Sequence, residues 1–305
     1  MIATIASHQL LSLRRQRVFA VSMGVLVAVT VMAGILGWSS HRTIIGVYDE
    51  AVKLLATRGE TAPPNPFLLK PTLSMLSNMV IYITLIGALV AIVIGHLSVG
   101  EDKATGIGRL IFSRQVSRTD YVVGKLTSSA IVLAIGMVAS ALVSVSALLI
   151  VNKSMPSGGD LIRLIGFYGL SWLYLMVFAL IGMVTVLLSH RRSLALLSAL
   201  GVWLVVTFAL PQFTSGLRPS TALNPIIDPV STSQTFFKVT ANARPYSVAE
   251  QFKGAAGRVL QTATAESGGA TIVRILPIVG LFVLLTLAAI RLVQRHDFSR
   301  STLGD

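Results

Sequence analysis

Six long apolar segments constrain the fold of this 305-residue chain more than any other feature of its sequence. A helix needs about 20 mostly apolar residues to cross the hydrocarbon core of a membrane. The segments cover residues 18–38, 76–97, 126–151, 164–189, 194–213 and 272–293. Only 12% of the residues are charged, about half the fraction typical of soluble domains. The sequence therefore predicts an all-α polytopic membrane protein with six transmembrane helices in a single transmembrane domain, residues 1–305.

The first apolar segment follows a basic N-terminal stretch. Residues 1–17 place apolar side chains on one helical face and end in Arg14, Arg15 and Arg17, which predicts an interfacial helix lying along the membrane. We interpret residues 18–38 as an uncleaved anchor, because the apolar core is too long for a signal peptide and no small-x-small cleavage site follows it.

Two of the apolar segments contain a proline. The fifth segment is expected to end at Pro211. Pro277 is expected near the start of the sixth helix, where its missing N–H would have no intrahelical partner in any case.

The distribution of basic residues predicts the orientation. Six spans place both termini on one side, and thirteen of the 25 Lys and Arg lie in the shorter segments on that side. The positive-inside rule therefore predicts cytoplasmic termini. The net charge of +13 is interpreted in the same way, as contacts with membrane lipids and not with nucleic acid.

Two long loops, residues 39–75 and 214–271, are then extracytoplasmic, and each contains a candidate helix. One covers residues 42–59 and is expected to stop at Gly59. The other carries a possible capping box at Ser247 and Glu250. Its apolar face comprises Val248, Phe252, Ala255, Ala256, Val259, Leu260 and Ala263. One interpretation is that these helices lie on the outer membrane face or cover the helix ends, and the other is that they form a docking surface for an extracytoplasmic partner protein.

The sequence contains little that could carry chemistry. It has no cysteine, no phosphate-binding G-x-x-x-x-G-K-[ST] loop and no H-E-x-x-H zinc motif, so we expect no catalytic, cofactor or metal site in this chain. Charged residues are absent from the interiors of the six segments, whereas glycine recurs there. Small residues allow close helix packing, and ion-driven carriers usually need buried charges. We therefore expect another component to supply energy.

The connection between the second and third segments, residues 98–125, concentrates eight charged residues. Its pattern predicts two short amphipathic pieces joined by a turn, with a helix start at Ser117 and Asp120. One interpretation is a solvated loop that only fixes topology. The other is a docking surface for a soluble protein, favoured because topology alone requires no acidic residues and no interleaved apolar face.

This connection resembles the loop after the second span of ABC-2-type transporter permeases. That loop runs from a Gly-Glu pair through an apolar run and a Pro-[Val/Leu]-[Ser/Gly]-Arg group to a Gly-Lys pair. The matching positions are Gly100-Glu101, Gly106-Ile107, Leu110-Ile111, Val116-Ser117-Arg118 and Gly124-Lys125. Thr105-Gly106 replaces the usual Gly-Thr, and Gln115 replaces the proline. The segment "LNPIID" (223–228) and the basic C-terminal tail are also similar. The nearest branch resembles permeases that serve nitrous oxide reductase maturation.

The resemblance implies a mechanism. Two permease chains, identical or different, would each sit on a separate cytoplasmic ATPase that binds ATP and Mg, in the inner membrane of a bacterium. Residues 98–125 would be a coupling loop that carries ATPase motion into the spans, with export as the expected direction. The expected coupling residues, which transmit or anchor that motion, are Glu101, Asp102, Arg109, Arg114, Arg118 and Lys125.

Two alternatives remain from the residues alone. A stand-alone secondary carrier or channel would require buried ionisable groups or a polar pore. A membrane-embedded lipid-modifying enzyme would require a cluster of Asp, His or Ser at a membrane edge. His190–Arg192 is the only cluster of that kind, and we interpret it as a basic tight turn.

Overall fold

A computed structural model describes residues 2–15, 17–61, 63–65, 71–104, 107–113, 116–152, 155–215, 217–219, 225–227, 235–262 and 268–295. Within these residues, six helices are long and apolar enough to cross a membrane, which confirms the predicted helical fold class. The elements preceding the third span are α1 (Ile2–Arg15), α2 (Val18–Thr57), η1 (Thr72–Leu76), α3 (Ser77–Tyr82), η2 (Ile83–Gly87), α4 (Ala88–Ala104) and α5 (Ile107–Phe112). The remaining helices are α6 (Arg118–Asn152), α7 (Gly158–Leu188), α8 (Arg192–Leu204), η3 (Val205–Ala209), α9 (Leu210–Ser215), α11 (Thr235–Thr240), η4 (Ala241–Tyr246), α12 (Val248–Val259) and α13 (Gly268–Arg295). Two three-residue strands, β1 (Leu217–Pro219) and β2 (Pro225–Ile227), form one antiparallel pair.

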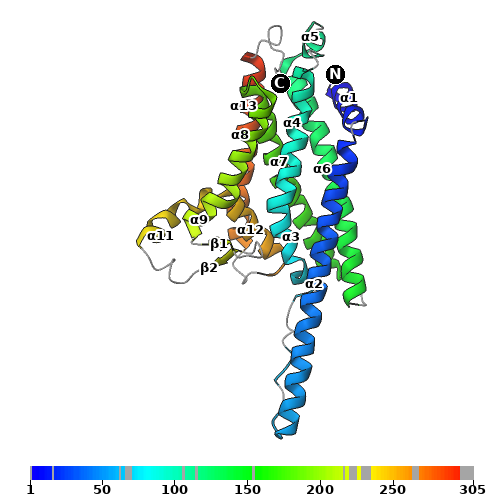
Figure 1. The fold of residues 1–305 in the computed structure, drawn as a ribbon, viewed down its shortest axis with the longest axis vertical. Helices are drawn as coiled ribbons and strands as arrows, with labels where there is room; N and C mark the ends of the chain where they lie inside the picture. Colours follow the sequence, from blue (N-terminus) through cyan, green and yellow to red (C-terminus); the bar gives the residue numbers. More distant parts are fainter. Residues whose placement is uncertain are drawn as a thin grey trace.

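The first span is much longer than its apolar segment. α2 is a continuous helix of 40 residues, which corresponds to about 60 Å, twice the thickness of a bilayer core. Its second half is the helix predicted at 42–59, which continues the span and projects beyond the bundle instead of lying across the helix ends (Figure 1). The predicted stop is confirmed, since α2 ends at Thr57 and Gly59 has a φ of +73°.

Both proline predictions were wrong. The fifth span passes through Pro211 and continues to Ser215. The five residues before Leu210 form a π-helical segment, and the wider turn relieves the clash between a proline ring and the carbonyl four residues earlier. Pro277 lies well inside α13, because that helix already begins at Gly268.

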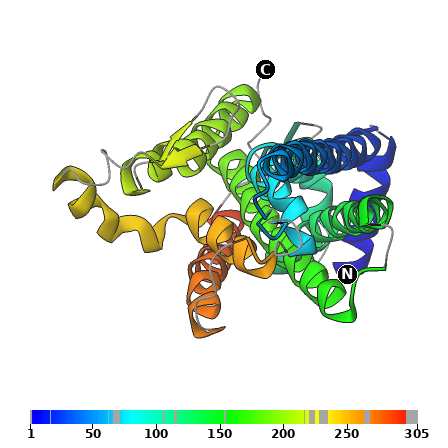
Figure 2. The ribbon, with the colours of Figure 1, turned by 90° about the horizontal axis from the view of Figure 1, so that it is seen from below.

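The bundle is organised around α7, the most deeply buried span. Viewed from below, α2 and α6 lie on one side of α7, and α8 and α13 lie on the other (Figure 2). α4 packs along α7 with the backbones in close approach: a Cβ placed on Gly95 would lie 1.8 Å from the carbonyl oxygen of Ala179. On the facing helix, a Cβ placed on Gly182 would lie 2.3 Å from the carbonyl oxygen of Ile92. The glycines here fit the expectation that small residues permit close packing.

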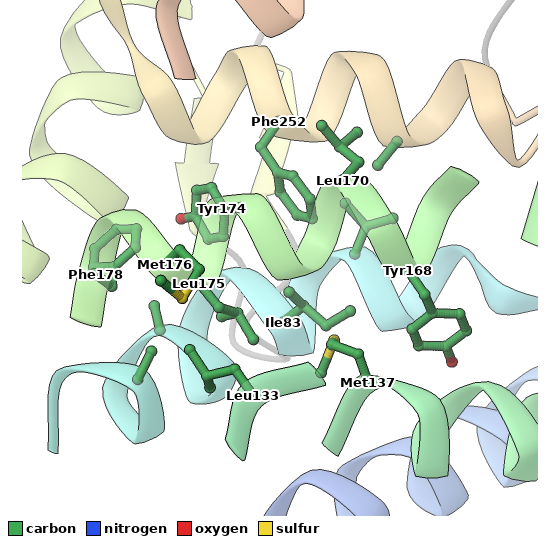
Figure 3. Close-up of a cluster of buried hydrophobic side chains, with 14 of the residues drawn as sticks. Ile83, Leu133, Met137, Tyr168, Leu170, Tyr174, Leu175, Met176, Phe178 and Phe252 are labelled. Carbon is green, nitrogen blue, oxygen red and sulfur yellow. The ribbon is translucent and has the colours of Figure 1, made fainter. Parts of the chain in front are cut away.

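The helix predicted around residue 250 packs inside the bundle. α12 contacts α7, α13 and α3, and Phe252 stacks on Tyr174 in the middle of α7, with ring centroids 4.3 Å apart (Figure 3). Of the predicted apolar face, Val259 is half-buried and Ala263 lies outside the described residues, while the buried members are Val248, Phe252, Ala255, Ala256 and Leu260. The helix lies alongside α7 and does not lie flat over helix ends. Burial of aromatic and alanine side chains against α7 accounts for this position.

The predicted capping box at α12 was wrong. Ser247 is the N-cap residue, but its side chain makes no capping hydrogen bond. Glu250 instead accepts hydrogen bonds from Arg244 Nε at 2.9 Å and Thr214 Oγ1 at 3.3 Å. A capping box forms at the start of α7, where the backbone N–H of Asp160 donates to Ser157 Oγ at 3.1 Å.

Two segments that supported the family resemblance are described only in part. Within "LNPIID", Pro225–Ile227 forms β2, and the other three residues lie outside the described residues. The basic tail is described as far as Arg295, the last residue of α13.

Candidate functional site

A group of polar side chains joins five helices at the end of the bundle where α1 and α5 lie (Figure 1). We call it the polar cluster. Its members are Gln9, Ser12, Glu101, Asp102, Lys103, Arg118, Tyr121 and Lys125. Three consecutive members, Glu101, Asp102 and Lys103, lie in the last turn of α4. Successive side chains of a helix point about 100° apart, so each of the three reaches a different neighbouring helix.

The centre of the polar cluster is an ion pair between α4 and α6. Lys125 Nζ lies 2.7 Å from Asp102 Oδ2, and both side chains are almost completely buried. Tyr121 donates its hydroxyl hydrogen to the same carboxylate at 2.7 Å, and Lys125 also donates to Gln9 Oε1 of α1. These partners satisfy the buried charges, and removing one partner of such a pair typically costs about 3–5 kcal/mol.

Two cations of the polar cluster cap the ends of other spans. Lys103 Nζ donates to the carbonyl oxygens of Val186 at 3.0 Å and Ser189 at 3.2 Å, at the end of α7. Arg118 donates to the carbonyl oxygens of Val293 at 2.6 Å and Gln294 at 3.0 Å, near the end of α13. The last carbonyls of a helix have no intrahelical partner and carry partial negative charge, so a cation is favourable there.

The polar cluster also holds the N-terminal helix. Ser12 of α1 donates a hydrogen bond to Glu101 Oε2 at 2.8 Å. Gly124 lets α1 approach α6, since a Cβ at that position would lie 2.9 Å from the Cβ of Ile5. α1 was predicted as an interfacial helix, and the structure in addition buries Ala6, Gln9 and Leu13 on one face, where α1 packs against α6.

The short helix α5 lies beside the polar cluster. The Phe112 ring packs against the Tyr121 ring, with centroids 5.2 Å apart and planes at 57°. The Arg118 guanidinium lies over the Phe112 ring, 5.5 Å from its centroid. α5 is therefore linked through one aromatic side chain to residues that bind α4 and α13.

Four of the six predicted coupling residues, Glu101, Asp102, Arg118 and Lys125, belong to the polar cluster and bind within the chain. Arg109 lies in α5, with a side chain outside the described residues, and Arg114 lies outside them altogether. Sequence reasoning missed Gln9, Ser12, Lys103 and Tyr121. The three adjacent charges at 101–103 were the available signal, because they cannot all face one partner.

The described residues contain no group of three or more His, Cys, Asp or Glu placed to hold a metal ion. The hydrogen bonds and the ion pair of the polar cluster instead hold five helices together, and α5 packs against the cluster through Phe112.

A family model described as ABC-2 family transporter protein matches residues 3–298. The chain therefore belongs to this family of membrane components of ABC transporters, and it is a multi-pass membrane protein. None of the curated proteins compared with the chain matches it.

Proposed function

We propose that the chain is the permease subunit of an ATP-driven exporter in a bacterial inner membrane, with a separate ATPase seated against residues 98–125. The observation that carries the proposal is the polar cluster, which ties α1, α4, α6, α7 and α13 together directly beside α5. Family membership supports a transporter role for the chain.

In this mechanism the charged residues of the loop have two roles, contact with the ATPase and attachment of the helix ends to one another. α5 and its neighbours contact the ATPase, while Asp102 and Lys125 anchor the ends of α4 and α6 from inside. Movement of α5 passes through Phe112 to Tyr121 and Arg118, and from there to the ends of α4 and α13. Because the helix ends are bound to one another through the polar cluster, they move together as one unit.

The nucleotide chemistry belongs to the partner. ATP and Mg²⁺ would be bound by the ATPase, and two permease chains would face each other across the assembly. The nitrous oxide reductase maturation branch stays a prediction. The helices between residues 39 and 75 and between 214 and 271 remain candidate contacts for an extracytoplasmic partner, with the protruding half of α2 as the more accessible of the two.

Site-specific cross-linking tests the proposal, and the absence of native cysteine makes single labels specific. Ser113→Cys follows the last residue of α5, and Met155→Cys lies in the connection from α6 to α7; both positions are exposed. The end of α6 that leads into this connection lies at the opposite end of the bundle from α5 (Figure 1). In membranes containing the full complex, we expect a short bifunctional reagent to join the cysteine at position 113, but not the one at 155, to the ATPase. No cross-link from position 113, or an equal one from position 155, would contradict the proposed docking.

A further inference from the structure

A lateral cavity lies between α4 and α8, close to the end that carries the polar cluster. Its volume is about 460 Å³, and its lining residues are Val93, His96, Leu97, Arg192, Ser193 and Leu196. His96 lies five residues before Glu101 on α4, and Arg192 is the first residue of α8. Neither residue belongs to the polar cluster, and the mechanism above uses neither.

The cavity has one charged end and an otherwise apolar wall. Arg192 and Ser193 open α8, where the first backbone N–H groups have no intrahelical partner and favour an anion. Arg192 is exposed and forms no hydrogen bond or ion pair with any described residue. Val93, Leu97 and Leu196 supply the apolar wall.

His96 provides an independent sign of a missing ligand. Its side chain is only 4% exposed, yet Nδ1 has no hydrogen-bond partner among the described residues. Buried polar nitrogens are nearly always paired, because leaving one unpaired forfeits its hydration. His96 lines the cavity, so a rotation of its ring toward the cavity would let a ligand oxygen supply the partner.

We propose that this cavity binds one anionic phospholipid. The phosphate-bearing headgroup lies against Arg192, the N-terminus of α8 and His96, while an acyl chain covers Val93, Leu97 and Leu196. The positive charge recognises the phosphate, and the apolar wall selects a lipid over a soluble phosphate. This inference goes beyond the proposed function. The one part that depends on the proposed orientation is the membrane leaflet that supplies the lipid, which is the cytoplasmic one.

The test uses the purified full-length permease in neutral detergent, without ATPase or nucleotide, so that failure of coupling cannot affect the result. Phosphatidylglycerol and phosphatidylcholine are titrated separately, and bound lipid is counted by native mass spectrometry. We expect one tightly bound phosphatidylglycerol, with an affinity weakened about tenfold in Arg192→Gln, as loss of one charge-assisted contact implies. Arg191→Gln removes the same charge from the adjacent exposed residue, which does not line the cavity, and should bind like the wild type.

His96→Phe is a second variant that retains the size of the ring and removes its nitrogens, and it should also weaken phosphatidylglycerol binding. Equal binding of phosphatidylcholine, or equal effects of the two arginine variants, would overturn the site. Displacement of the lipid by millimolar inorganic phosphate would overturn the assignment to a lipid.

Discussion

Asp102 and Lys125 illustrate, at the scale of single residues, how this chain uses charge at the edge of its membrane spans. The pair is buried and satisfied by Tyr121 and Gln9, so it acts as a fastener between helices. An exposed pair would contribute at most about 1 kcal/mol. We expect the loss of either charge of the buried pair to lower the free energy of unfolding by several times that amount, because the remaining charge cannot be solvated.

The first prediction concerns this pair. Asp102→Asn should lower the free energy of unfolding by about 3–5 kcal/mol, because it leaves Lys125 buried without its counter-ion. Thermal unfolding in detergent measures the effect, with Asp49→Asn on the exposed part of α2 as the matched control. Equal melting temperatures for the two variants would show that the ion pair does not fasten α4 to α6.

The second prediction concerns the cap of α7. Lys103→Met keeps the apolar stem and leaves the carbonyls of Val186 and Ser189 without their donor. The expected loss of stability is about 1–3 kcal/mol, the usual effect of an unsatisfied buried polar group. Lys53→Met, on the exposed part of α2, removes the same charge and should leave the unfolding temperature unchanged. The role of Lys103 as a cap is rejected if both variants melt alike.

At the scale of elements, the close approach of α4 and α7 depends on glycine. Gly182→Ala would place a Cβ 2.3 Å from a backbone oxygen of α4, which cannot move without separating the two helices. Overpacking of this kind typically costs about 1–3 kcal/mol or more. Gly201→Ala in α8 meets nothing within 4 Å and is the matched control. We expect only the variant at 182 to reduce folded yield and melting temperature in detergent, and comparable losses in both would refute the packing account.

The elements also show what the sequence could and could not predict. The apolar segments were found because hydrophobicity is a local property, and the stop at Gly59 was found because a positive φ favours glycine. The continuity of α2 through residues 39–57 was missed, because a change from apolar to mixed composition marks the membrane boundary and not a helix end. The position of α12 depends on packing against Tyr174, which no local pattern encodes.

The same limit applied to the candidate site. The concentration of charge in residues 98–125 was visible in the sequence, and so was its similarity to a coupling loop. Which helix each charge binds was not visible, because Lys103 and Arg118 find their partners 83 and 175 residues away along the chain. Long-range pairing of this kind depends on the assembled bundle, so a sequence pattern gives the residues and not their roles.

At the scale of the whole molecule, the proposed coupling predicts a consequence of charge reversal. Glu101→Lys or Arg118→Glu should uncouple ATP hydrolysis from transport while leaving membrane insertion intact, because each charge binds a different helix to the polar cluster. ATPase activity and transport in reconstituted vesicles would be compared, with the exposed Arg14→Glu as the control. Unchanged coupling in both cluster variants would count against the mechanism.

The central claim is that motion of α5 passes through the polar cluster into the spans. If the spans move as rigid helices, their opposite ends must move as well, so a distance measured there in the full complex is the most direct test. One spin label is placed at Arg58→Cys, directly after α2, and the other at Met155→Cys, between α6 and α7. The C-terminal ends of α2 and α6 both lie opposite α5 (Figure 1). Pulsed electron resonance should show that their separation changes when a non-hydrolysable ATP analogue binds the ATPase. The change should disappear in Phe112→Ala, which cuts the link to Tyr121, and persist in Phe213→Ala, an exposed aromatic outside α5. A separation that ATP leaves unchanged, or that changes equally in Phe112→Ala, would contradict the account.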